Sequence, residues 1–130
     1  MRKFRFQKLV RDKVVDGILN EGNKPDFKTL SEREYIKELK LKLLEEAKEL
    51  PKAKNDNIIR ELADIQEIID NLIKALGLVQ EQLKEAQEKK NELAGSFKKR
   101  HYIKDIKVQD NSERIKYYLQ FPDKYPEIKD

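Results

Sequence analysis

The fold of this chain is decided by residues 31–50, which read SEREYIKELKLKLLEEAKEL. Ser31 with Glu34 three positions later is a capping box, in which each side chain bonds the backbone of the other residue. A helix is therefore predicted to begin at residue 32. Pro51 cannot continue a helix, so the helix is predicted to end near residue 50.

Three more helices and a different tail are predicted around this segment. Gly and Pro number four each, and this scarcity favours long helices over a turn-rich fold. The other helices are predicted at about residues 10–21, 56–76 and 79–94, after an irregular lead-in at residues 1–9. Residues 96–130 are predicted to form a C-terminal arm. Within it, HYIKDIKV at residues 101–108 is rich in β-branched and aromatic residues, which predicts a short strand.

Composition bounds the fold and excludes several classes of protein. The chain has 130 residues, 42% charged and 38% hydrophobic, which predicts one domain over residues 1–130 with a thin core. We expect an all-α fold: an antiparallel bundle of about four helices, completed by association into a dimer or tetramer. The absence of cysteine excludes disulfides and thiolate zinc sites, and favours the cytoplasm. No apolar run approaches the length of a membrane span, so no membrane partner is expected.

Both long helices carry acids where apolar residues are expected. The first helix has an apolar stripe at residues 35, 39, 43 and 50. Glu46 lies within this stripe, and Glu49 borders it about one turn later. The second helix has a heptad-like seam at residues 65, 68 and 72. Glu61 lies at the start of that seam, and Asp64 borders it.

The short connection between these helices predicts antiparallel neighbours, with both acid pairs near the connected ends. Carboxylates gathered at one helix interface repel one another and lose hydration. A hard divalent cation resolves this conflict, and Mg²⁺ prefers oxygen ligands. The candidate metal ligands are therefore Glu46, Glu49, Glu61 and Asp64. The alternative is a pair of solvated helix faces, because glutamates at helical spacing are common in so charged a chain.

The same residues resemble a known family. EEAKE at residues 45–49, followed by ELAD at residues 61–64, matches the EExxE…ExxD signature of the MazG-like all-α nucleoside triphosphate pyrophosphohydrolases. KLVRDKV near the N-terminus, then EGNKP and later GSFKKRHYI, resemble the phosphoribosyl-ATP pyrophosphohydrolase-like branch, over roughly residues 7–105. That branch usually reads RGGF where this chain has AGSF at residues 94–97, so one arginine is missing.

The resemblance implies a helical bundle that binds Mg²⁺, with Mn²⁺ as a substitute, and works as an oligomer. It implies hydrolysis of a (d)NTP or related nucleotide between the α- and β-phosphates, giving a monophosphate and pyrophosphate, and a role in clearing non-standard nucleotides. Matched by position, the metal ligands are Glu46, Glu49, Glu61 and Asp64. Glu45 matches the first acid of the signature and is a candidate for orienting the attacking water or a ligand. Glu45 and Glu46 are therefore the candidate catalytic residues.

Cationic side chains are expected to hold the substrate phosphates, and the candidates are Lys90, Arg11 and Lys13. Lys90 interrupts an apolar row of the predicted helix 79–94 and matches a family lysine seven residues before the motif phenylalanine. The alternative for Lys90 is a side chain whose stem covers the core. The alternative for Arg11 is a structural ion pair that fastens the N-terminal segment.

A non-enzymatic helical adaptor or nucleic-acid-binding module is the alternative function. The charged helices are compatible with it, and so is a basic N-terminal cluster made of Arg2, Lys3, Arg5, Lys8, Arg11 and Lys13. The net charge of +4 suits anionic ligands but does not identify nucleic acid, because the two signs of charge are interleaved through most of the chain. The aromatic residues are not interleaved with the basic ones, however, and an adaptor has no need for acids in its seam. A nucleotide is therefore the expected ligand rather than nucleic acid.

Overall fold

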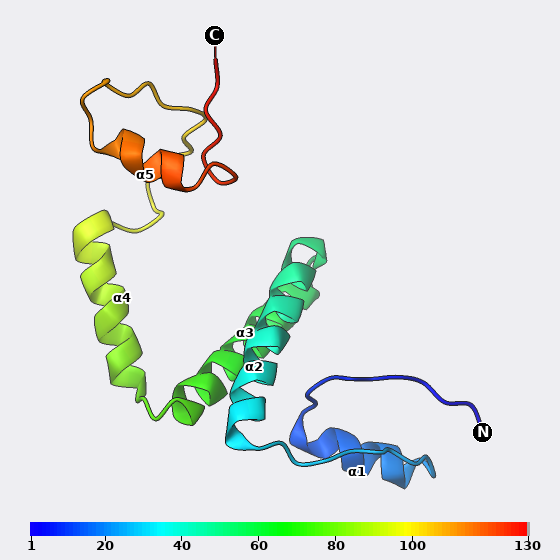
Figure 1. The fold of residues 1–130 in the computed structure, drawn as a ribbon. Coiled ribbons are helices and arrows are strands. Elements are labelled where there is room, and N and C mark those ends of the chain that lie inside the picture. The colour runs from blue at the N-terminus through cyan, green and yellow to red at the C-terminus, as the bar shows by residue number, and fades with distance from the viewer. Residues whose placement is uncertain (130) are drawn as a thin grey trace. The chain divides into compact units, whose positions relative to one another are not determined.

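A computed structural model describes residues 1–129, and the secondary structure of these residues is entirely helical (Figure 1). The helices are α1 (Asp12–Asn20), α2 (Glu32–Glu49), the 3₁₀ helix η1 (Leu50–Lys52), α3 (Asp56–Ala75), α4 (Gln80–Ala94) and α5 (Arg114–Gln120). The chain divides into two compact units, Met1–Ala94 and Gly95–Asp130. Among the described residues, no helix is both long and apolar enough to cross a membrane.

The signals that were expected to bound α2 act as predicted, whereas the Asn55 side chain at the start of α3 makes no capping hydrogen bond. The Glu34 N–H donates to Ser31 Oγ at 3.3 Å, and the Ser31 N–H donates back to Glu34 Oε1 at 3.4 Å, so the capping box is formed. Pro51 lies in the 3₁₀ turn that ends α2. Helix α3 ends at Ala75, and Gly77 follows its C-cap with a φ of 73°, which is readily adopted only without a Cβ.

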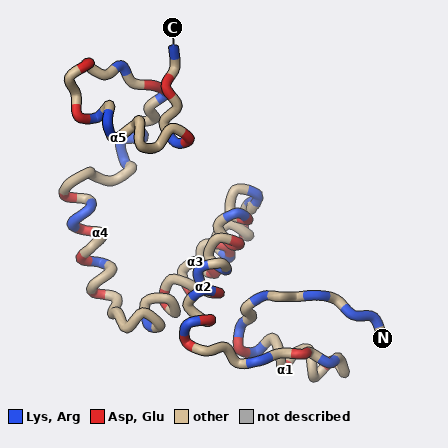
Figure 2. Tube along the Cα trace, viewed as in Figure 1, with Lys and Arg blue, Asp and Glu red and all other residues tan. Residues whose placement is uncertain are grey.

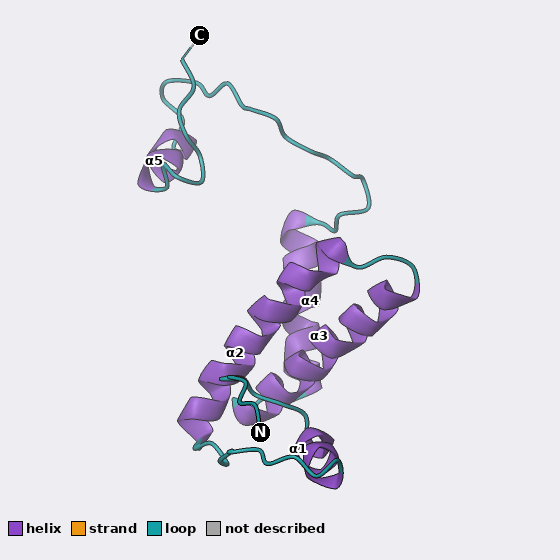
Figure 3. Ribbon diagram, turned by 90° about the vertical axis from the view of Figure 1, so that its right-hand side faces the viewer, coloured by secondary structure: helices purple, strands orange, loops and turns teal. Residues whose placement is uncertain are grey.

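Helices α2 and α3 lie side by side as an antiparallel hairpin (Figures 1 and 3). Their direction follows from the contacts, because Tyr35 near the start of α2 meets Asn71 near the end of α3. Leu39 and Ile68 are buried between the helices, as the predicted apolar stripes require. Burial of each such side chain contributes about 1.5–3 kcal/mol, so truncating Leu39 to alanine should cost about 2–5 kcal/mol.

The N-terminal segment is held against the hairpin by charge. Lys8 Nζ lies 2.7 Å from Glu45 Oε1, and an Arg11 guanidinium nitrogen lies 2.6 Å from Asp64 Oδ1. Figure 2 shows Lys and Arg concentrated along this segment, whereas both signs of charge alternate along α2 and α3. The ion pairs therefore place the start of α1 beside the acids of the hairpin.

Two finer expectations are not confirmed. All four predicted helices are present, but every residue of α4 is exposed, so a bundle of about four helices is not confirmed. The strand expected at residues 101–108 is not confirmed either, because that segment forms no helix or ladder. β-Branched residues favour a strand only where a neighbouring strand accepts their backbone hydrogen bonds, and no such partner occurs in residues 1–129.

The unit Gly95–Asp130 contains instead the short helix α5, which the sequence patterns did not predict. The N–H of Arg114 donates to Ser112 Oγ at 3.2 Å at the start of this helix. A cluster of aromatic rings packs on and after it, formed by Tyr117, Tyr118, Phe121 and Tyr125. Centroid separations of 4.9–5.8 Å are typical of packed aromatic side chains, so these rings pack against one another within the unit.

Candidate functional site

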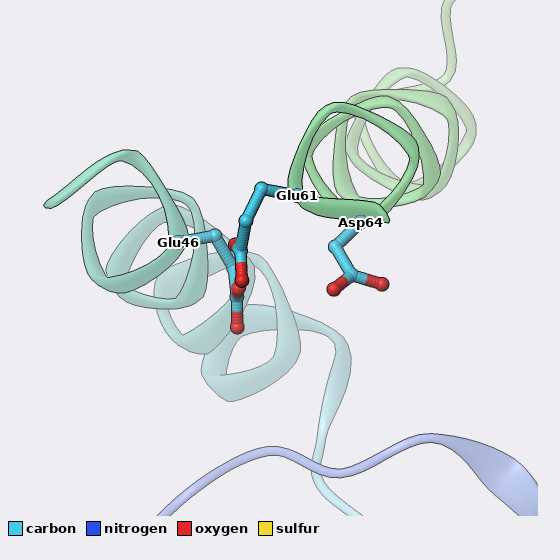
Figure 4. Close-up of side chains that lie close together, drawn as sticks. All are labelled: Glu46, Glu61 and Asp64. Atoms are coloured by element: carbon cyan, nitrogen blue, oxygen red, sulfur yellow. The ribbon is translucent and has the colours of Figure 1, made fainter. Parts of the chain in front are cut away.

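Three carboxylates converge between the two helices of the hairpin. Glu46 projects from α2, and Glu61 and Asp64 project from α3 toward the same region (Figure 4). One oxygen from each carboxylate lies within 4.8 Å of the others. Glu61 and Asp64 are one turn apart on α3, and the antiparallel packing brings the late part of α2 to their level.

Glu46 is the most informative member of this acidic cluster. Only 17% of its side chain is exposed, as expected for an acid within the apolar stripe. Burial raises the pKa of Glu46 above its ordinary value, and the neighbouring carboxyls of Glu61 and Asp64 raise that pKa further, against the opposing charge of Lys42. The folded chain therefore holds a carboxyl that is costly to ionise without a compensating cation.

Glu61 adds a second sign of an incomplete site. Its Oε2 atom is buried and has no hydrogen-bond partner among the described residues. An unpaired buried polar atom costs about 1–3 kcal/mol, which a hydrogen-bond donor or a cation at that oxygen would recover. The donor set of Glu46, Glu61 and Asp64 consists only of carboxylate oxygens, which fits Mg²⁺ or Mn²⁺ and not a soft metal.

Three cationic side chains border the acidic cluster. Arg11 binds Asp64, and Lys8 binds Glu45, as described above. Lys42 Nζ lies 3.4 Å from Glu45 Oε2 and 3.9 Å from Glu46 Oε1. The hydrogen bond from Lys8 lowers the pKa of Glu45, and the same bond raises the pKa of Lys8. The Glu45 carboxyl therefore binds a proton less readily than an ordinary glutamate, and the Glu46 carboxyl binds one more readily.

Not every predicted ligand lies in the acidic cluster. The structure brings Glu46, Glu61 and Asp64 together, whereas Glu49 is exposed and lies outside this group. Glu45 lies beside the cluster with 35% of its side chain exposed, and Lys8 and Lys42 both bind it. Its position suits contact with water at the edge of the cluster.

Of the three predicted phosphate ligands, one lies at the acidic cluster and two form no ion pair with a described residue. Arg11 lies at the acidic cluster, through its bond to Asp64. Lys13 and Lys90 are exposed, and neither forms an ion pair with any residue that the structure describes. Sequence reasoning missed Lys42 altogether, although its spacing of three and four residues from Glu45 and Glu46 on one helix was a usable signal.

A pocket of about 490 Å³ opens between the N-terminal segment and the hairpin. Acids of the cluster and Arg11 line one part, and apolar side chains from both sides line the middle. The lining residues are Phe6, Leu9, Val10, Arg11, Asp12, Val14, Tyr35, Leu39, Lys42, Glu46, Asp64, Glu67, Ile68 and Asn71. This volume is in the usual range of about 300–1,000 Å³ for sites that bind small molecules.

The assignment of a function rests on this arrangement of side chains. The MazG-like family membership expected from the sequence stays a prediction. Comparisons with models of protein families, with curated proteins and with solved structures found no match to this chain.

Proposed function

We propose that this chain is a Mg²⁺-dependent nucleotide pyrophosphohydrolase. It would cleave a (d)NTP or related nucleotide between the α- and β-phosphates, releasing a monophosphate and pyrophosphate. The observation that carries the proposal is the convergence of Glu46, Glu61 and Asp64 within 4.8 Å, with Glu46 and Asp64 also lining the pocket of about 490 Å³. The resemblance of the sequence to MazG-like enzymes supports the same reaction, and suggests the clearing of non-standard nucleotides as its role.

The chemistry of the bond explains why these residues suit the reaction. Glu46, Glu61 and Asp64 would hold the cation, and Glu49 is the proposed fourth ligand. A Mg²⁺ ion bound there would supply positive charge to neutralise phosphate oxygens and lower the pKa of the attacking water. Water forms a new P–O bond and loses a proton to the solvent, while the anhydride P–O bond breaks and the leaving pyrophosphate keeps the bonding electron pair.

The remaining charged side chains have separate tasks. Glu45 stays ionised because Lys8 lowers its pKa, so it serves as a hydrogen-bond acceptor that orients water. Arg11 has several N–H donors, of which one nitrogen already binds Asp64, and it is the proposed donor to a substrate phosphate. Lys42 lines the same pocket and adds positive charge near the phosphates.

An oligomer is part of the proposal. Few apolar side chains are buried within the hairpin, whereas α3 exposes Ile58, Ile59 and Leu62, by 42%, 67% and 46% respectively. Exposed apolar residues at helical spacing favour packing against another helix pair. A second copy of the hairpin would complete a four-helix core, giving the expected dimer or tetramer.

The test is a panel of ribo- and deoxyribonucleoside triphosphates incubated with Mg²⁺ and assayed for release of pyrophosphate. Asp64→Asn should abolish hydrolysis and leave the helical circular dichroism spectrum unchanged. Asp70→Asn is the matched control, because Asp70 lies on the same helix and does not line the pocket. The proposal is wrong if no nucleotide releases pyrophosphate, or if Asp64→Asn retains full activity.

A further inference from the structure

We propose that Tyr35, Glu67 and Asn71 form a base-recognition end of the pocket, selective for nucleobases that carry an exocyclic amino group. This inference rests on the proposed function, because it takes the ligand to be a nucleotide. All three residues line the same pocket as Glu46 and Asp64. Asn71 lies seven residues after Asp64 on α3, which is about 10 Å along the helix axis. A nucleotide with phosphates at the acids would thus place its base near Asn71.

Hydrogen bonds fix the orientation of the Asn71 amide. Its Nδ2 atom donates to the backbone oxygen of Glu67 at 2.8 Å and to Glu67 Oε2 at 2.9 Å. Both partners can only accept, so the nitrogen of the amide must face Glu67. The Oδ1 atom therefore faces Tyr35, whose hydroxyl lies 3.5 Å away and donates to it.

The polar groups that remain free at this end of the pocket are hydrogen-bond acceptors. Both N–H groups of the Asn71 amide are used, and the proton of the Tyr35 hydroxyl points to Asn71. One lone pair of Asn71 Oδ1 and the second oxygen of the Glu67 carboxylate remain. An amino group on a base donates two hydrogens to such acceptors, whereas an oxo group in the same place meets their lone pairs.

The middle of the pocket suits the flat part of a nucleoside. Leu39 and Ile68 are 4% and 8% exposed and lie between the acidic cluster and Asn71 along their helices. Leu9 and Val10 of the N-terminal segment line the pocket with them and are half-buried. Apolar walls bind the faces of a base or sugar without preference, so discrimination falls to the polar end.

The experiment compares ligands that carry an amino or an oxo group at the same ring position, with the neighbouring ring nitrogen an acceptor in the amino member and an N–H donor in the oxo member. Calorimetry would measure binding of CMP against UMP, and of AMP against IMP, to the full chain. We expect the amino member of each pair to bind about tenfold more tightly, since its partner leaves acceptors unpaired. Glu67→Gln should reduce both preferences toward unity by presenting a donor. Asp70→Asn, also an acid-to-amide change on α3 but outside the pocket, should retain them.

The outcomes separate this inference from the proposed function. Equal binding within each pair, tighter binding of UMP and IMP, or no binding of any monophosphate overturns the inference, and hydrolysis of triphosphates alongside would leave the proposed function intact. Selective binding of CMP and AMP without hydrolysis of any triphosphate supports base recognition and overturns the hydrolase proposal. Preferences that survive unchanged in Glu67→Gln remove Glu67 from the recognition site.

Discussion

Replacing Glu61 with glutamine should stabilise the metal-free protein and abolish its response to Mg²⁺. Glu61 has two acidic neighbours, with one oxygen of each carboxylate within 4.8 Å of the others. At an effective dielectric constant of about 20, two unit charges at that separation repel by about 3.5 kcal/mol. Lys42 and Arg11 offset part of this repulsion, and Asp64 is 40% exposed, so solvent screens its share.

The substitution also affects the buried Oε2 atom of Glu61, which has no hydrogen-bond partner among the described residues. A neutral amide costs less to bury than a carboxylate and can donate to Glu46. Together these effects should raise the free energy of unfolding in EDTA by about 1–2 kcal/mol, net of the offsetting charges. For a domain of this size the midpoint Tm should rise by about 4–8 °C.

Thermal unfolding followed by circular dichroism, in EDTA and in excess Mg²⁺, measures both effects. The unsubstituted protein should gain about 2.7 kcal/mol when Mg²⁺ is at 100 times its Kd, whereas Glu61→Gln should gain little. Glu85→Gln is the control, because Glu85 is exposed on α4 and outside the pocket. A variant that is less stable than the parent in EDTA, or that keeps the full response to Mg²⁺, would refute this reasoning.

Three further predictions concern the same cluster. Because the pKa of Glu46 is raised, its protonation stabilises the folded state below the ordinary pKa of a glutamate, and this contribution is lost as pH rises through the raised pKa. Mg²⁺ binds the deprotonated carboxylate, so the increase in Tm caused by Mg²⁺, measured between about pH 5 and pH 8, should grow with pH. An increase in Tm that becomes smaller with pH would contradict this prediction. Arg11→Gln should raise KM for a triphosphate while changing Tm by only a few degrees, because the ion pair between Arg11 and Asp64 is exposed and worth about 0–1 kcal/mol. An unchanged KM would mean that Arg11 only holds the N-terminal segment against the hairpin. Glu49→Gln should leave Tm in EDTA unchanged, because Glu49 is exposed, and should weaken Mg²⁺ binding in titration calorimetry; unaltered binding would remove Glu49 from the ligands.

Local sequence signals were sufficient to predict the hairpin. The capping box at Ser31 and Glu34 and the proline at residue 51 act within one turn, so their effect does not depend on distant residues. Placement of Glu46 in an apolar stripe followed from helical periodicity alone. Antiparallel packing then made its approach to the acids of α3 a geometric consequence, which can be derived without any resemblance to a known family.

Helical periodicity and capping signals did not predict the contacts between segments that are distant in the sequence. The bonds from Lys8 to Glu45 and from Arg11 to Asp64 join residues 37 and 53 positions apart. Periodicity does not say which of many exposed cations meets which acid. The strand expected at residues 101–108 failed to form for a related reason, because strand propensity depends on a partner that the local sequence does not specify.

The polar end of the pocket likewise depends on a contact between residues that are distant in the sequence. The Tyr35 to Asn71 contact joins two helices whose register fixes it, so it appears only once the hairpin is built. Each residue alone reads as an ordinary seam or surface position. Asn71 also pairs with Glu67, which lies four residues earlier on α3. Side chains at this spacing are neighbours on a helix, so a search of the sequence for polar residues four positions apart would have found this pair.

The most direct test of the central claim is a titration with Mn²⁺ followed by electron paramagnetic resonance, in which bound ions lose the signal of the free ion. If Glu46, Glu61 and Asp64 hold a divalent cation, the protein should show saturable binding that Mg²⁺ displaces and that Glu46→Gln eliminates. A signal that rises linearly with added Mn²⁺, as in buffer alone, would contradict the claim, and so would saturable binding that survives in Glu46→Gln.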